Sequence, residues 1–202
     1  MLLHPSDVLK MTYDTNSSAV ARKKSVCVIH TGAEEVFLYR RLVDYSSQPE
    51  SRFAFNEIVD HAVDSGDSGE AGVCGKLVEQ LADEEYVMLL AGERTAELRG
   101  TGLRALLTGL YMRRPIIVVN LDGCRHCDPS RLPAELERRL FLCISSEFPV
   151  LEYALDSWRD EAFRLSSMDQ THAAVYPPEM YQTLLPEEAS APLGHIHQRM
   201  AL

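Results

Sequence analysis

The chain has 202 residues, of which 46% are hydrophobic, and these values fit one domain with one sizeable core and short appendages. Asp and Glu total 30 against 20 for Lys and Arg, a formal charge of -10, which argues against a nucleic-acid backbone or an anionic membrane as partner. No apolar run approaches the roughly 20 residues of a membrane span, and the first residues lack a signal-peptide pattern, so we expect a cytoplasmic protein.

The first part of the chain predicts an arm followed by a strand, a helix and a second strand. Residues 1–22 show no sustained period, which indicates an N-terminal arm. A strand is predicted at 25–29, and after a His-Thr-Gly turn a helix is predicted over 33–44, with acidic residues in its first turn. A second strand is predicted at 53–59, and the polar stretch 60–72 is predicted as a long loop.

The segment 85–123 organises the rest of the chain. Its two short apolar runs, at 86–91 and 114–119, are bounded by Gly and Pro and joined by a segment of helical period, which is typical of strand, helix and parallel strand. A further helix is predicted ahead of this unit, because Val73, Leu77, Val78 and Leu81 share one face.

The last part predicts an irregular segment at 124–133, a fifth strand at 140–144 and a helix starting near Phe148. From about residue 166 the composition changes to Pro, Glu, Ser, His and Met, so we expect the domain to cover 23–165 and an extended tail to cover 166–202. Five strands alternating with helices predict a doubly wound, flavodoxin-like α/β fold. Its parallel sheet has the order 2-1-3-4-5 and helices on both faces.

Ligands of such sheets bind at the carboxyl ends of the strands, near the point where the strand order reverses. This rule brings to one rim the polar residues and glycines that follow the predicted strands: His30, Thr31, Gly32, Asp60, His61, Gly92, Glu93, Asn120 and Asp122. The Thr31-Gly32 turn stands before a helix and can offer backbone N–H groups to a phosphate. The same turn is equally explained as a simple reversal of the chain.

The cysteines predict neither a metal site nor a disulfide framework. Cys124 and Cys127 form one Cys-x-x-Cys pair, whereas a closed zinc site needs about four ligands. The other three cysteines fall on predicted strands or helices and are expected in the core. We therefore expect reduced thiols and ordinary loop cysteines, with a metal or partner contact and redox chemistry as the alternatives. His195 and His197 in the tail are expected to be solvated.

Four blocks of sequence resemble a known family. They are 25–30 (SVCVIH), 39–42 (YRRL), 87–95 (VMLLAGERT) and 114–123 (RPIIVVNLDG). Their order is similar to that in the Toll/interleukin-1-receptor-like (TIR-like) domains of bacterial defence proteins, in particular the sensor of Thoeris anti-phage systems, over roughly residues 24–163. Active members of that family cleave the nicotinamide bond of NAD and make an ADP-ribose-type messenger. The resemblance therefore implies NAD as substrate and no separate cofactor.

The resemblance also implies a catalytic glutamate on the helix between the last two blocks, where a carboxylate can stabilise the oxocarbenium-like charge on the ribose. The expected position falls on Arg104 or Ala105, so the sequence departs from the family there. The nearest carboxylates are Glu97, which can serve if the helix start is shifted, and Glu93. The nucleotide-binding candidates are His30, Thr31, Gly32, Asp60, Gly92 and Arg104, the last because arginine suits a pyrophosphate.

Two alternatives stay open. A TIR-like domain without chemistry can act by self-association or by binding a partner effector protein. A flavodoxin-like module unrelated to defence can bind another small molecule. The sequence contains no Walker loop, Gly-x-Ser-x-Gly elbow or His-Glu-x-x-His motif, which removes the common hydrolase and phosphotransfer templates.

Overall fold

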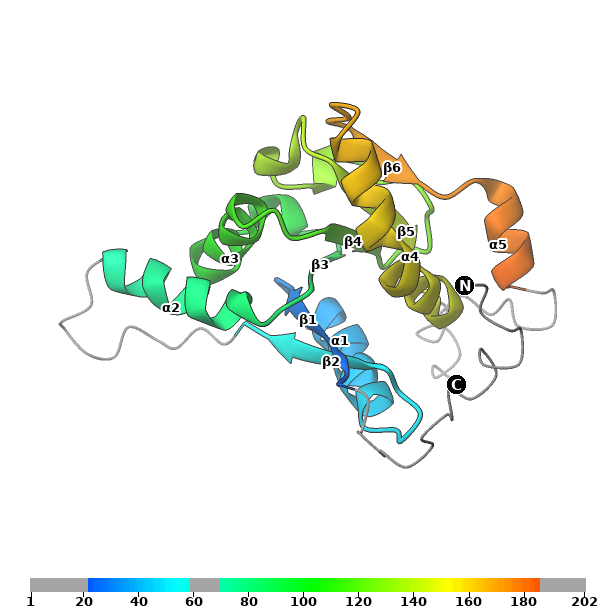
Figure 1. The fold of residues 1–202 in the computed structure, drawn as a ribbon, viewed down its shortest axis with the longest axis horizontal. Helices are drawn as coiled ribbons and strands as arrows, with labels where there is room; N and C mark the ends of the chain where they lie inside the picture. Colours follow the sequence, from blue (N-terminus) through cyan, green and yellow to red (C-terminus); the bar gives the residue numbers. More distant parts are fainter. Residues whose placement is uncertain (1–21, 59–69, 186–202) are drawn as a thin grey trace, which may run out of the picture.

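The computed structural model describes residues 22–58 and 70–185 and contains one parallel sheet of order β2-β1-β3-β4-β5-β6 (Figure 1). All neighbouring strands in it are parallel. The strands are β1 (Lys24–Ile29), β2 (Phe53–Glu57), β3 (Tyr86–Ala91), β4 (Ile116–Asn120), β5 (Phe141–Ser145) and β6 (Ala173–Val175). The predicted doubly wound α/β fold and its strand order are confirmed, and one strand is added at the β5 edge.

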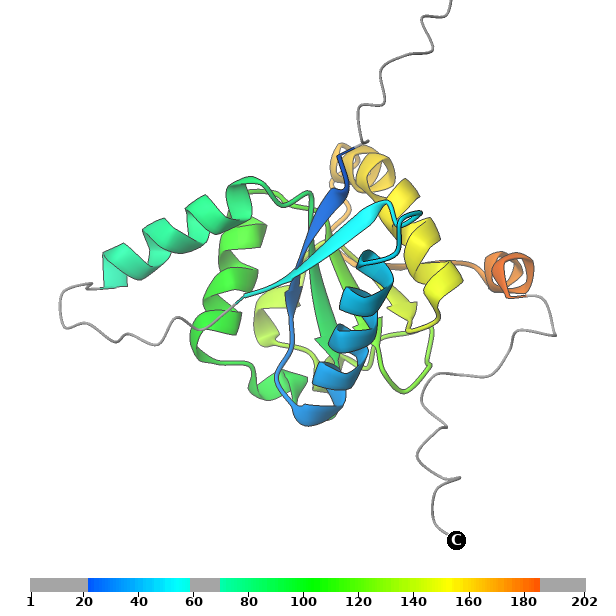
Figure 2. The same ribbon diagram turned by 90° about the horizontal axis from the view of Figure 1, so that it is seen from below.

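The helices form a layer on each face of this sheet (Figure 2). Helices α1 (Ala33–Ser46) and α4 (Phe148–Ser166) cover one face, where Leu42 and Trp158 join the larger core cluster. Helices α2 (Glu70–Ala82) and α3 (Gly100–Tyr111) cover the other, where Leu81 and Leu106 join a second cluster. A short helix, α5 (Pro178–Leu184), follows β6. No helix in the described part of the chain is both long and apolar enough to cross a membrane.

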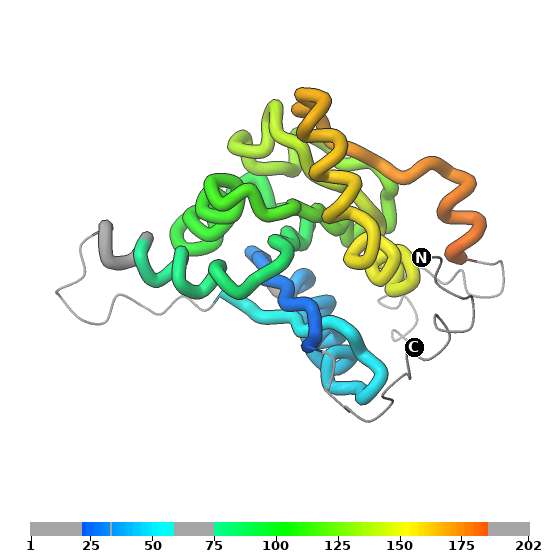
Figure 3. Tube along the Cα trace, viewed as in Figure 1, coloured from blue at the N-terminus to red at the C-terminus, as the bar shows by residue number. Residues whose placement is uncertain are grey.

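Burial on both faces explains why the central strands are apolar along their whole length. All six residues of β3 are buried, as are all five residues of β4 and of β5. Parallel strands of this kind are covered by helices on both sides, so their sequences do not alternate between apolar and polar residues. The chain runs from β1 to the edge strand β2 and then returns past β1 to form β3, which can be followed in Figure 3.

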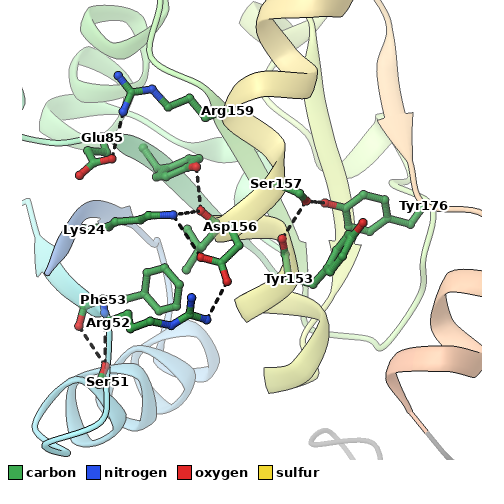
Figure 4. A network of polar contacts seen from close by, with 12 residues as sticks. Lys24, Ser51, Arg52, Phe53, Glu85, Tyr153, Asp156, Ser157, Arg159 and Tyr176 are labelled. Atoms are coloured by element: carbon green, nitrogen blue, oxygen red, sulfur yellow. Dashed lines mark hydrogen bonds and ion pairs between the residues drawn. The ribbon is translucent and has the colours of Figure 1, made fainter. Parts of the chain in front are cut away.

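Helix α4 is attached to the amino ends of the strands by a polar network (Figure 4). The Asp156 carboxylate pairs with Lys24 at 3.1 Å and with Arg52 at 2.6 Å. Within the core beside this network, the Trp158 indole N–H donates to the Ile116 carbonyl at 2.9 Å. These contacts fix the amino-terminal end of the sheet and leave the carboxyl-terminal end for a site.

The expectation of an extended tail from residue 166 does not hold for residues 173–184. The three-residue strand β6 pairs with β5, and the Tyr181 side chain of α5 is only 8% exposed. A strand this short shows no usable periodicity, and both elements depend on contacts with β5 and α4 that are distant in sequence. Residues 1–21 of the arm predicted at 1–22, and the tail histidines at 195 and 197, lie outside the described residues.

The expectation of reduced thiols is wrong for one pair, because Cys127 and Cys143 form a disulfide. Cys143 lies on β5 inside the core, as expected, and the segment after β4 folds back so that Cys127 reaches it. Which cysteines meet is decided by this return of the chain and not by their spacing. Cys27 is buried and free, and Cys124 is exposed and free.

Candidate functional site

A cleft of about 370 Å³ opens at the carboxyl ends of β1 and β2, facing the segment that connects β3 to α3. It therefore lies beside the point where the strand order reverses, as the sequence predicted. Its lining comes from the ends of two strands and from one turn: Val28, Ile29, His30, Thr31, Glu57, Ile58, Arg94, Glu97, Leu98, Arg99, Gly100, Thr101 and Gly102.

One wall of the cleft is built by His30 and Glu57. The parallel register sets Val28 opposite Glu57, the last residue of β2. His30, the residue after β1, therefore lies close to Glu57. His30 Nε2 lies 2.8 Å from a Glu57 carboxylate oxygen, and the His30 side chain is only 12% exposed. Behind it, the Tyr39 ring of α1 packs at 5.5 Å between centroids, and burial raises the pKa of its phenol. The imidazole is thus held in place at the edge of the cleft.

The turn after β1 rests on a buried carboxyl group. Glu35 of α1 is 3% exposed, and its Oε1 accepts a hydrogen bond from the Thr31 hydroxyl at 3.2 Å. A Cβ at Gly32 would lie 2.5 Å from Glu35 Oε2, and one at Gly92 would lie 2.3 Å from Oε1. A side chain at either position would therefore require the Glu35 carboxyl group to shift.

This arrangement changes the roles expected of the two glycines. A carboxyl group directly beneath the Thr31-Gly32 turn opposes the binding of a phosphate there. The Gly92 amide already donates to the Thr95 hydroxyl at 2.8 Å, and Gly92 does not line the cleft. Thr31 does line it, whereas Asp60, the remaining candidate on this side, and its neighbour His61 lie outside the described residues.

The opposite wall is formed by the short helix η2 (Thr95–Glu97) and the start of α3. The Arg94 guanidinium binds the Glu97 carboxylate through two nitrogens, at 3.2 and 2.9 Å. The Glu97 side chain is 64% exposed, so this ion pair is open to solvent. Glu97 thus faces the cleft from the turn before α3, whereas Glu93 is exposed and does not line it.

Positive charge in the cleft comes from residues that the sequence analysis did not select. Arg94 and Arg99 line it, together with the first residues of α3, which has no side-chain N-cap. Arg104 lies one turn further along the helix and does not line the cleft, and Ala105 is buried against the sheet. The sequence did contain a signal for Arg94, because it follows β3 closely, after Gly92 and Glu93. Residues just beyond a strand of this fold reach the rim.

The remaining rim candidates, Asn120 and Asp122, bind residues of the segment that follows β4. The Asn120 amide donates to the Cys124 and His126 carbonyls at 2.9 and 3.0 Å, and Asp122 pairs with Arg131 at 3.0 Å. Neither lines the cleft, so the structure separates them from His30 and Thr31.

The cysteine segment contains one free, exposed thiol, Cys124, and one disulfide-bonded cysteine, Cys127. Among the described residues no group of three or more His, Cys, Asp and Glu side chains is placed to hold a metal ion. The pKa of the Cys124 thiol is raised, first by the Asp122 carboxylate and then by burial, which disfavours the reactive thiolate.

No family model matches the chain, and no curated protein is significantly similar to it.

Proposed function

We propose that the chain binds NAD or a related ADP-ribose-type nucleotide in this cleft. We further propose that it converts NAD to an ADP-ribose-type messenger, as a TIR-like signalling protein of prokaryotic anti-phage immunity. One observation carries the proposal: a cleft at the reversal point of a doubly wound sheet brings Arg94, Arg99 and the start of α3 next to the Glu97 carboxylate. Cations and N–H donors can bind the pyrophosphate of such a nucleotide, and a carboxylate can accept hydrogen bonds from its ribose hydroxyls.

The charges in the cleft give the nucleotide an orientation. The pyrophosphate is attracted to Arg94, Arg99 and the amino end of the 12-residue helix α3. It is kept away from the Thr31-Gly32 turn by the carboxyl group of Glu35. The ribose hydroxyls then lie within reach of the His30 and Glu57 wall.

The ion pair between Arg94 and Glu97 supplies a switch for the chemistry. A pyrophosphate that binds Arg94 competes with Glu97 for the guanidinium and releases the carboxylate towards the ribose. As the bond between C1′ and the nicotinamide nitrogen breaks, nicotinamide leaves with the bonding electrons, and Glu97 stabilises the positive charge on the ribose. Water or a hydroxyl of an acceptor nucleotide then attacks C1′, and its proton passes to solvent water.

The test is the release of nicotinamide from NAD by the purified full chain, with and without a lysate of phage-infected cells. We expect Glu97→Gln to lower the rate about 100-fold or more. Glu79→Gln, a change on the exposed face of α2, is the control and should leave the rate unchanged. Intact NAD under both conditions would remove the enzymatic proposal, and a loss specific to Glu93→Gln would move the carboxylate role to Glu93.

A second candidate is binding of the nucleotide without cleavage, and the absence of a carboxylate at positions 104 and 105 favours it. Arg104 or Ala105 stands where the TIR-like resemblance implies a catalytic glutamate, and the cleft carboxylate of Glu97 is engaged by Arg94. Such a domain would act through self-association or a partner effector. Calorimetry with ADP-ribose separates this candidate, because binding weakened about tenfold by Arg99→Gln without any nicotinamide release would support it.

A flavin-binding module is less well supported. No Phe, Tyr or Trp is among the described residues that line the cleft, so an isoalloxazine ring would lack an aromatic stacking partner there. A yellow protein that releases flavin on heating would contradict this assignment.

A further inference from the structure

We propose a second binding site, for a small organic anion with an apolar body, at the edge of the sheet that β5 and β6 form. A groove of about 570 Å³ lies between the segment that connects β4 to β5 and the residues that lead into β6. That segment contains the short helices η3 (Pro129–Arg131) and η4 (Ala134–Leu136). Figure 3 shows it in yellow-green next to the orange start of β6. The volume falls within the range of small-molecule sites.

The floor of the groove is apolar. Leu136 and Phe141 line it while being only 2% and 5% exposed, and Leu132 and Pro133 continue the same surface. Cys127 lines the groove as well, and its disulfide with Cys143 attaches this wall to β5. The floor is thus part of the core and is already formed in the absence of a ligand.

The rim of the groove carries an excess of positive charge. Arg138 and Arg139 line it and are exposed, and the acidic residue lining it is Glu137. None of the ion pairs between described residues involves Arg138 or Arg139. In a chain with a formal charge of -10, two adjacent arginines without acidic partners among the described residues form a local site of attraction for an anion.

These two features select the chemistry of the ligand. A carboxylate or sulfonate can pair with the guanidinium groups, and an aromatic or aliphatic body can cover Leu132, Leu136 and Phe141. A small hydrophilic anion can pair only with the guanidinium groups of the rim, and a neutral apolar molecule can cover only the apolar floor. An amphipathic organic acid satisfies both.

The experiment uses the fluorescent probe 1-anilinonaphthalene-8-sulfonate, titrated into the full chain at low ionic strength. We expect Arg138→Gln/Arg139→Gln to raise the Kd of the probe at least tenfold. The matched control is Arg40→Gln/Arg113→Gln, which removes the same charge from exposed arginines, one of them at a positive φ of 55 like Arg138 at 58. The control should change the Kd less than twofold.

A second variant tests the apolar floor without altering charge. Ala134 lines the groove and is exposed, so Ala134→Trp should fill the groove and abolish probe binding while the chain stays folded. Octanoate should displace the probe, whereas equal concentrations of acetate and octanol should not. Equal probe affinity in all variants, or equal displacement by acetate, would overturn the proposal. Saturating ADP-ribose should leave the probe bound, and displacement by ADP-ribose would assign the probe to the nucleotide cleft instead.

Discussion

Glu35 and the two glycines above it show how one side chain restricts its neighbours. The glutamate occupies the first turn of α1, where the helix dipole favours an acidic residue. In the structure its neighbour Glu34 is exposed, whereas Glu35 is buried beneath the turns that follow β1 and β3. The space for a side chain at positions 32 and 92 is therefore limited by a residue on a helix.

Gly92→Ala is expected to destabilise the protein by about 1 kcal/mol, the low end for an added methyl group in a packed site, because the new Cβ would lie 2.3 Å from Glu35 Oε1 and the carboxyl group has to shift. Urea unfolding measures the loss. The control is Gly75→Ala on α2, where a Cβ meets nothing within 4 Å and where alanine should add about 0.5–1 kcal/mol of helix stability. In a double-mutant cycle, Glu35→Ala should reduce the cost of Gly92→Ala, and strict additivity would contradict the contact.

Tyr86 gives the stability of the protein a dependence on alkaline pH. Burial is the main cause that raises the pKa of its phenol to about 12, and its hydroxyl donates to the Leu155 carbonyl at 2.7 Å. The folded state thus keeps a proton that the unfolded state loses near pH 10, so this contribution is complete below pH 10 and is lost towards pH 12. Chemical unfolding at several pH values should show a smaller alkaline loss for Tyr86→Phe than for the native chain. Identical slopes would contradict the assignment.

At the scale of elements, the disulfide attaches the segment after β4 to β5. Asn120 reinforces the attachment, because its amide also contacts Cys143 Sγ at 3.3 Å. The sequence could predict neither contact, since Cys127 lies in an irregular segment and Cys143 lies in a strand that is 16 residues away. Only the return of the chain along β5 brings the two sulfur atoms together.

Reduction of this disulfide, or Cys127→Ser, should lower the free energy of unfolding by about 3 kcal/mol, the value typical of a closed loop near 15 residues. Thermal unfolding with and without a reducing agent measures the change. Cys124→Ser is the control, because Cys124 is exposed and free, and its Tm should not shift. An equal Tm for Cys127→Ser and Cys124→Ser would show that the disulfide adds nothing to stability.

At the scale of the whole molecule, the two core clusters share one sheet. Val26 and Val28 face the α1 and α4 side, and Cys27 and Ile29 between and after them face the α2 and α3 side. If either helical layer separated from the sheet, it would expose one face of strands whose other face the second layer covers. The folded part of the chain is therefore expected to unfold as one unit.

The chain contains one tryptophan, Trp158, which is 1% exposed and bonded to β4, so its fluorescence reports on the sheet and on α4 together. Guanidinium unfolding followed by this fluorescence and by far-UV circular dichroism should give coincident curves. Two separate midpoints would show that the layers unfold independently.

The sequence by itself determined the strand order of the first five strands and the place of the cleft. The reason is that buried parallel strands must be continuous apolar runs, and the connection of alternating strands and helices restricts their order. It also placed His30 and Thr31 at this rim, because they directly follow the first strand, whereas Glu97 was a candidate only through the TIR-like resemblance.

Only the tertiary structure decided the features that depend on residues distant in the chain. These are the sixth strand, the disulfide, the buried Glu35 and the choice of Arg94 and Arg99 over Arg104 as the cations of the cleft. Local periodicity contains no information on such contacts, since β6 is too short to show a period and the direction in which α3 leaves the rim is set by packing on the sheet.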